Sequence, residues 1–190
     1  LWNNVGVKLS SDWEEHVEQA QRIRQKYLDK FPGIPRYIWN QKRALLRDHK
    51  VSSLTGRVRH LPCPYGEDTP GFGHLLNQAI NFPIQSLASD VTGSAMVDVE
   101  AELLRKYNLT YEEYHWRLME GKPPTMPLLI NEVHDDLVYD MPKKGLRDNL
   151  AMISEIMASV PTLRALLPEF DVPLKTGQKV GSRWGLDDRK

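Results

Sequence analysis

The sequence has one cysteine, no long apolar run and no net charge. A lone Cys63 rules out a disulfide within the chain, and no stretch approaches the roughly 20 apolar residues of a membrane span. The six histidines show no His-x-x-x-His spacing and no Cys-x-x-Cys pair occurs, which argues against a zinc site. Glycine loops of the P-loop and dinucleotide-binding types are also missing. These absences favour a cytoplasmic protein with no membrane partner.

The composition is that of a folded protein. Of 190 residues, 41% are hydrophobic and 26% are charged, which supplies enough apolar surface for a core. This length fits one domain or part of a larger one. Since the first residue is Leu1 and not Met, we expect the chain to be part of a longer polypeptide or to have been processed.

The zero net charge hides three blocks of different sign. Residues 1–64 carry 12 Lys and Arg against 6 Asp and Glu, residues 65–140 carry 4 against 13, and residues 141–190 carry 9 against 6. The basic stretch from Arg22 to Arg59 fits either a surface that follows a phosphate backbone or an ordinary solvated helix face. The acidic block fits either a cation site or plain surface.

Hydrophobic spacing predicts an α+β fold with long helices packed on a small antiparallel sheet. The five expected helices cover Ser11 to Phe31, Pro35 to His49, His74 to Tyr107, Thr110 to Gly121 and Lys143 to Val160. Extended segments are expected at Val51 to Pro62, on both sides of His134, and as an edge strand at Val172 to Lys175. Pro83 is expected to start or kink its helix. The five tryptophans are expected in a core or an interface.

Two adjacent carboxylates, Asp135 and Asp136, follow His134 at the expected hairpin turn. Magnesium is usually held by one or two carboxylates together with substrate phosphates. Because adjacent strand residues point to opposite faces, one of the two is expected to face a metal and the other to lie at its rim. A complete two-metal site needs a further carboxylate from elsewhere. A solvated turn without a metal remains the alternative.

An uncharged polar stripe runs along the longest predicted helix, where helix surfaces are normally charged. Four side chains recur at four-residue spacing: Asn77, Asn81, Gln85 and Ser89. Amide donors one turn apart can bond to the acceptors that every base pair shows in the minor groove, and so bind a duplex without reading its sequence. The alternative is a buried amide pair that satisfies backbone groups beside Pro83.

Four segments in combination resemble the C-terminal part of a family A, polymerase I-like DNA polymerase. Among the members of that family, the phage-type sequences look most similar to this one. The segments that carry the resemblance, in chain order, are Phe31-Pro32-Gly33-Ile34, Thr55-Gly56-Arg57-Val58-Arg59-His60-Leu61-Pro62, Asn77 to Asp90, and Val133-His134-Asp135-Asp136-Leu137-Val138. The Ala-Ile-Asn-x-Pro-x-Gln helix followed by Val-His-Asp-acid-Leu is highly specific to that family.

The resemblance implies a role for each site residue. Asp135 would be the metal-binding aspartate of motif C, and Asp136 would be its acidic neighbour, where the family usually has Glu. Together they would be catalytic and bind magnesium, with two Mg²⁺ ions in the complete site. The implied DNA-binding residues are His134, Asn81, Gln85, Asn77, Arg57 and Arg59. Asn77 stands where many relatives place an Arg, which puts that contact in doubt.

The resemblance also implies an organisation and partners. Residues 1–50 would be the C-terminal end of the fingers with connecting helices, and residues 51–190 would be part of the palm. The partners would be primer-template DNA, deoxynucleoside triphosphates, and an upstream portion that supplies the other metal-binding Asp and the nucleotide-binding helix. The location would be cytoplasmic, in the host cytoplasm for a phage-encoded protein.

Two other functions stay open. The chain could be a non-catalytic module that binds or scaffolds duplex DNA and has kept the groove-reading residues. A relative of the single-subunit RNA polymerases is a weaker third possibility, since the residues that choose deoxynucleotides are expected upstream.

Overall fold

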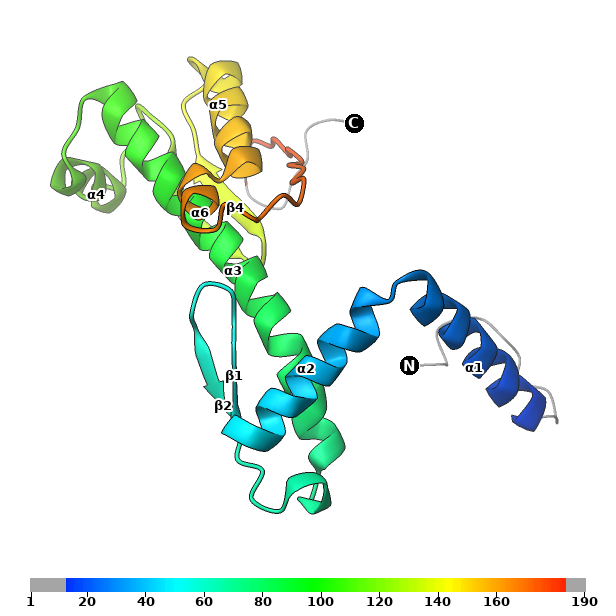
Figure 1. Ribbon diagram of the computed structural model, residues 1–190. Helices are drawn as coiled ribbons and strands as arrows, with labels where there is room; N and C mark the ends of the chain where they lie inside the picture. Colours follow the sequence, from blue (N-terminus) through cyan, green and yellow to red (C-terminus); the bar gives the residue numbers. More distant parts are fainter. Residues whose placement is uncertain (1–12, 184–190) are drawn as a thin grey trace. The chain divides into compact units, whose positions relative to one another are not determined.

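The computed structural model describes residues 13–183 and divides into two compact units. One unit comprises the residues up to Val51 together with Val58–Phe82, and the other comprises Ser52–Arg57 together with the residues from Pro83 onward. Figure 1 shows the elements coloured along the chain. Within the described part of the chain, no helix has the length and apolar character needed to span a bilayer.

The first unit is mainly helical. Its elements are α1 (Trp13–Lys30), α2 (Gly33–Asp48), most of β1 (Lys50–Ser52), β2 (Val58–His60), the short 3₁₀ helix η2 (Gly66–Asp68) and the start of α3 (Phe72–Tyr107). Strands β1 and β2 pair into a two-stranded sheet. The buried core residues of the unit come from α2, the strands, the loop after them and α3: Leu45, Val51, Leu61, Cys63 and Ala79. The thiol of Cys63 donates to the Gly66 carbonyl at 3.0 Å, so this cysteine is a core residue with a local partner.

The second unit is built around the rest of α3. Its other elements are α4 (Tyr111–Met119), β3 (Leu128–Val133), β4 (Asp136–Asp140), α5 (Leu146–Ser159) and α6 (Pro161–Leu166). The main core packs Val99 and Leu103 of α3 against Tyr114, Leu128 and Ile153. A second cluster joins α3 to the α6 region through Ala95, Val160, Leu163 and Leu167. Figure 1 shows α5 and α6 beside this part of α3.

The fold confirms the α+β prediction of long helices with small antiparallel sheets. Helix α4 begins with the predicted capping box, in which Thr110 Oγ1 accepts from the Glu113 amide and Glu113 accepts from the Thr110 amide. The capping box predicted at Ser11 to Glu14 involves residues outside the described range. Strands β3 and β4 form the predicted hairpin.

Several element predictions were wrong at their edges. Helix α2 begins at Gly33 and not at Pro35. Pro83 lies inside α3, so of the two expected roles it does not start the helix, and a kink there stays a prediction. Helix α6 was missed, because a left-handed Val160 ends α5 and Pro161 then opens a new helix.

The predicted edge strand at Val172 to Lys175 is absent from the described structure. The Arg164 guanidinium binds the carbonyls of Phe170 and Val172, at 2.5 and 2.9 Å. Further along, the Gln178 side chain donates to Ser154 Oγ on α5. The segment is therefore tied to helices through side-chain donors and has no strand partner.

Of the two positions expected for the tryptophans, the core is wrong wherever the structure describes them, and an interface stays a prediction. Trp13, Trp39 and Trp116 are 60%, 55% and 71% exposed. Trp2 and Trp184 lie outside the described residues.

Replacing Tyr114 with Phe should destabilise the second unit. The buried Tyr114 hydroxyl accepts a hydrogen bond from the Leu129 amide at 3.1 Å, and its loss leaves a partly buried N–H without a partner. We expect a fall of about 1–3 kcal/mol in the free energy of unfolding, measured by urea denaturation. Tyr111→Phe, on the exposed side of α4, is the matched control. Equal effects of both changes would contradict this assignment.

Candidate functional site

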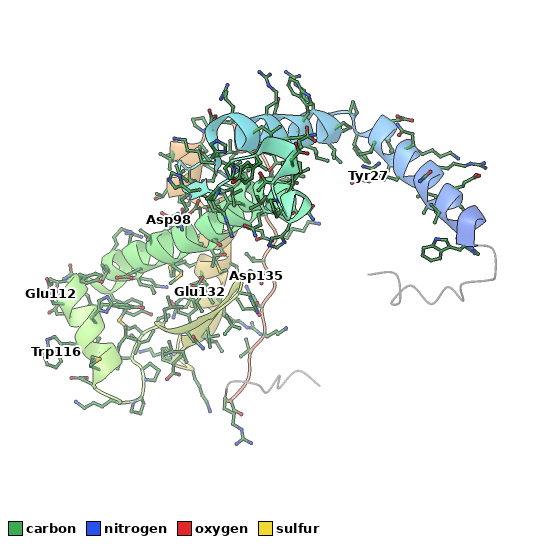
Figure 2. All side chains as sticks on the ribbon, turned by 90° about the horizontal axis from the view of Figure 1, so that it is seen from below. Tyr27, Asp98, Glu112, Trp116, Glu132 and Asp135 are labelled. Carbon is green, nitrogen blue, oxygen red and sulfur yellow. The ribbon has the colours of Figure 1, made fainter. Side chains whose placement is uncertain are left out.

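The candidate site is the tip of the β3–β4 hairpin. Val133 pairs with Asp136, so His134 and Asp135 form a two-residue turn and Asp136 is the first residue of β4. The sequence therefore places one carboxylate in the turn and the other at the start of the strand. Figure 2 shows Asp135 at this end of the hairpin, with Glu132 on β3 nearby.

The base of the hairpin is fixed while its tip is exposed. Leu128 is buried in the main core, and Tyr139 packs against the same cluster from β4. Burial raises the pKa of the Tyr139 phenol, and burial also raises the pKa of Tyr114 beneath it. A register shift between Leu129 and Asn131 adds one residue to β3, and such bulges re-aim the side chains beyond them.

The turn holds His134 in an unusual backbone conformation. Its φ is +59°, while Asp135 is not among the residues with positive φ. A two-residue turn with a positive φ at its first position is the II′ pattern, which ordinarily has glycine there. Keeping a histidine at this position costs backbone energy, and strained residues of this kind cluster at functional sites.

The turn carboxylates are available to a ligand. Asp135 and Asp136 are both exposed, and within the described structure neither side chain has an ion pair or a hydrogen bond. Residues 13–183 contain no group of three or more His, Cys, Asp or Glu side chains arranged to hold a metal. Hard oxygen donors without a counter-ion fit Mg²⁺, but as part of a site whose other ligands come from elsewhere.

The polar stripe on α3 is a surface feature. Asn77, Asn81, Gln85 and Ser89 are all exposed, which excludes the buried amide pair considered from the sequence. Asn77 and Asn81 belong to the first unit, and Gln85 and Ser89 to the second. The Ser89 hydroxyl donates to the Gln85 backbone carbonyl at 3.2 Å, while the exposed side-chain amide of Gln85 has no hydrogen bond within the described residues.

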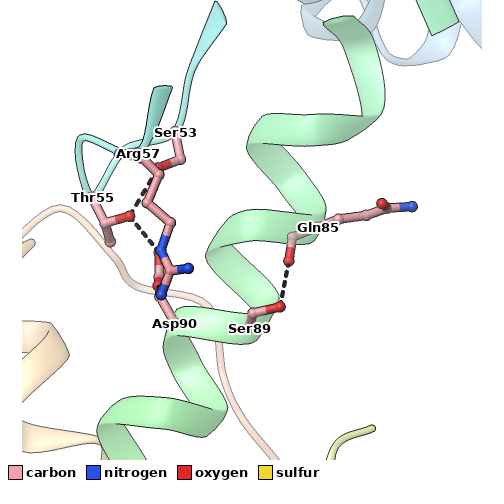
Figure 3. A network of polar contacts seen from close by, with 6 residues as sticks. All are labelled: Ser53, Thr55, Arg57, Gln85, Ser89 and Asp90. Atoms are coloured by element: carbon pink, nitrogen blue, oxygen red, sulfur yellow. Dashed lines mark hydrogen bonds and ion pairs between the residues drawn. The ribbon is translucent and has the colours of Figure 1, made fainter. Parts of the chain in front are cut away.

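Arg57, in the loop between β1 and β2, lies against a different face of α3 from the one that carries Gln85. Its guanidinium pairs with Asp90 at 2.7 Å, and the Thr55 hydroxyl also donates to Asp90. Figure 3 shows the Gln85 side chain pointing away from this network. The structure therefore does not bring Arg57 and Gln85 to one surface.

The loop that carries Arg57 is shaped by its own backbone. Gly56, at φ +89°, donates to the Ser53 carbonyl at 3.1 Å, and the Arg57 amide donates to Ser53 Oγ at the same distance. Only glycine adopts that φ at little cost, so Gly56 allows the turn that aims Arg57 at Asp90. The Arg57 side chain is still 64% exposed, against 10% for Asp90.

Arg59 lies in the first unit with partners of its own. It donates to Gln78 Oε1 at 3.0 Å and lies over the Phe82 ring. Gln78 in turn bonds to His74 at 2.6 Å. These contacts orient an exposed guanidinium along the first part of α3.

Sequence reasoning missed Asp90, the partner that fixes Arg57. A signal was present, because Asp90 is the sole Asp, Glu, Lys or Arg between Thr69 and Val97. A lone carboxylate in so neutral a helix is a good candidate for an ion pair with a basic residue from elsewhere in the chain. Its partner could not be named without the fold.

Comparison with known proteins places the chain in a family. Residues 4–186 match the model for DNA polymerase family A. The chain therefore belongs to DNA polymerase family A.

Curated relatives agree with this membership. The chain is 29% identical over 167 residues to DNA polymerase I of Bacillus caldotenax, covering 88% of this chain and 16% of the relative. It is 26% identical over 157 residues to the chloroplastic DNA polymerase I A of Oryza sativa subsp. japonica, covering 83% and 14%. The chain thus spans about a sixth of the first relative.

A solved structure supports the fold. It is the POL domain of Pol1 from M. smegmatis in complex with DNA primer-template and dNTP, with a TM-score of 0.59. The match covers 75% of this chain and 22% of that one, at 22% sequence identity.

Replacing His134 with Gly should stabilise the hairpin. Removing Cβ relieves the cost of a positive φ and so adds roughly 1–2 kcal/mol to the free energy of unfolding. The greater conformational freedom of glycine in the unfolded chain lowers that free energy by roughly 0.5–1 kcal/mol. We expect a net gain of about 0.5–1 kcal/mol in the free energy of unfolding, measured by denaturant titration. His134→Ala keeps Cβ and should show no such gain. If the two variants are equally stable, His134 is not strained.

Proposed function

We propose that this chain is a C-terminal part of a DNA-directed DNA polymerase that adds deoxynucleotides to a primer 3′ end. The observation that carries the proposal is the turn, where two exposed carboxylates without counter-ions sit on a hairpin whose base is buried. A turn without a ligand gains nothing from placing two like charges side by side. Family membership supplies the reaction class.

Asp135 and Asp136 would hold the metal in the complete enzyme. Asp135 would be the main ligand and Asp136 the neighbour at its rim, while another aspartate comes from an upstream portion. When bound, two Mg²⁺ ions supply positive charge at the attacking and leaving oxygens of phosphoryl transfer. The fixed base of the hairpin would keep the carboxylates in place, so that little reorganisation is needed during the reaction.

The other predicted site residues would bind the primer-template duplex. Asn77, Asn81 and Gln85 expose neutral donors, which suits a protein that must accept every base pair. His134 would lie against the primer terminus, next to the carboxylates. Arg57 and Arg59 would meet backbone phosphates with guanidiniums already oriented by Asp90 and Gln78.

The remaining parts of the proposal concern the rest of the enzyme. Residues 1–50 would end the fingers and residues 51–190 would belong to the palm. An upstream portion would supply the nucleotide-binding helix that holds the deoxynucleoside triphosphate. We place the protein in the cytoplasm, that of the host if a phage encodes it.

Asp135→Asn should abolish primer extension while leaving duplex binding largely intact. The assay is magnesium-dependent extension by this chain joined to an upstream polymerase portion. Because the change removes a negative charge that holds the cations, we expect a loss of about 100-fold or more. Asp140→Asn, at the base of the same hairpin, is the matched control and should retain activity.

Normal turnover by the Asp135 variant would contradict the assignment. The non-catalytic duplex-binding module would be favoured instead by two results together. The unsubstituted chain would show no extension, alone or joined to an upstream portion, and Asn81→Ala and Gln85→Ala would weaken its binding of duplex DNA.

A further inference from the structure

Helix α2 has an inner and an outer face of opposite character. The inner face places Leu45, with Ala44 and Leu46 beside it, in the core of the first unit. The outer face carries five exposed residues: Arg36, Trp39, Asn40, Arg43 and Arg47. At 3.6 residues per turn these five lie within an arc of about 100°. We call them the α2 outer face.

A tryptophan and an arginine are stacked on this face. The Arg43 guanidinium lies 4.5 Å from the centroid of the Trp39 ring, yet Trp39 remains 55% exposed. The contact holds the indole in place without burying it. The α2 outer face therefore offers an oriented aromatic surface to solvent.

Positive charge on this face is largely unneutralised. The sole acidic residue of α2 is Asp48, which pairs with Arg47 at 2.7 Å. Across residues 13–183 no salt bridge reaches Arg36 or Arg43, while the neighbouring Lys42 is paired with Glu67 at 2.7 Å. Two guanidiniums beside an exposed tryptophan thus face solvent without a carboxylate partner. Their unpaired positive charge complements the negative charge of a polyanion.

The combination favours unpaired over paired nucleic acid. Bases in a duplex are stacked on one another and cannot lie on a protein ring, whereas an unpaired base can stack on an indole while its phosphates meet arginines. Arg36 and Arg47 are about 16 Å apart along the helix, at 1.5 Å per residue. That span matches a few successive nucleotides.

We propose that the α2 outer face binds single-stranded DNA, with an unpaired base stacked on Trp39 and phosphates on Arg36 and Arg43. The proposal rests on the proposed function for the identity of the nucleic acid, since a polymerase template has an unpaired strand. It does not use the hairpin turn or the α3 stripe. Arg43 would serve twice, holding the indole and contacting a phosphate.

The test is fluorescence polarisation with a labelled 12-nucleotide oligo-dT, which forms no secondary structure. Trp39→Leu should weaken binding about tenfold. Arg36→Gln with Arg43→Gln should also weaken it, and should flatten the slope of log affinity against log salt by about 1.4, since each lost phosphate contact on a single strand changes that slope by about 0.7.

Two matched controls separate this face from general attraction. Arg24→Gln with Lys26→Gln removes the same charge from exposed positions on α1, and Trp116→Leu removes an exposed tryptophan from α4. Neither control should change binding of oligo-dT by more than about twofold. Circular dichroism checks that each variant is folded.

Three results would each overturn the proposal. The first is that Trp39→Leu and the Arg36/Arg43 variant bind oligo-dT as tightly as the unsubstituted chain, and the second is that the α1 control weakens binding as much as the α2 variants do. The third is that the unsubstituted chain does not bind oligo-dT at about 100 mM salt. The assay contains EDTA, so it does not depend on metal-dependent catalysis. If the α2 variants bind normally while extension still depends on Asp135, only this inference fails. If extension never occurs but the α2 variants weaken binding, only the proposed function fails.

Discussion

The hydrogen bond from the Leu129 amide to the buried Tyr114 hydroxyl fixes the candidate site to the core. It joins β3 to α4 at the point where the hairpin leaves the apolar interior. Leu128 and Tyr139 bury the base on the same cluster, and the strands become exposed at the end next to the turn, at Glu132, Val133 and Asp136. Packing at the base therefore sets the direction of the two strands that carry the acidic residues at the exposed tip.

Helix α3 carries the second constraint, since its faces do different things. One face packs Ala95, Val99 and Leu103 into the two cores of the second unit. A second face carries the neutral amides, and Asp90 on a third holds Arg57. Neutrality between Thr69 and Val97 would suit the proposed contact with polyanionic DNA, because any carboxylate there would repel phosphates. Asp90 escapes that conflict because Arg57 and Thr55 cover it.

Much of this organisation could be predicted from the sequence, where the local pattern was strong. The α4 capping box, the β3–β4 hairpin and the long helix follow from short-range rules. The features that the sequence did not reveal depend on side-chain partners and backbone angles that the local pattern does not specify. Arg164 occupies the Val172 carbonyl at the start of the predicted strand, and the ion pair of Arg57 depends on a residue 33 positions away. The positive φ of His134 was equally hidden, because histidine gives no sign of a position that suits glycine.

The most direct test of the account asks whether the turn binds a divalent cation when this chain is joined to the upstream polymerase portion that would supply the remaining ligands. Mn²⁺ can replace Mg²⁺ at oxygen ligands and broadens nearby amide signals in NMR spectra. The account predicts broadening centred on His134, Asp135 and Asp136, which Asp135→Asn removes. Broadening confined to another acidic segment, such as Glu112 and Glu113 on α4, or none at the turn, would contradict it.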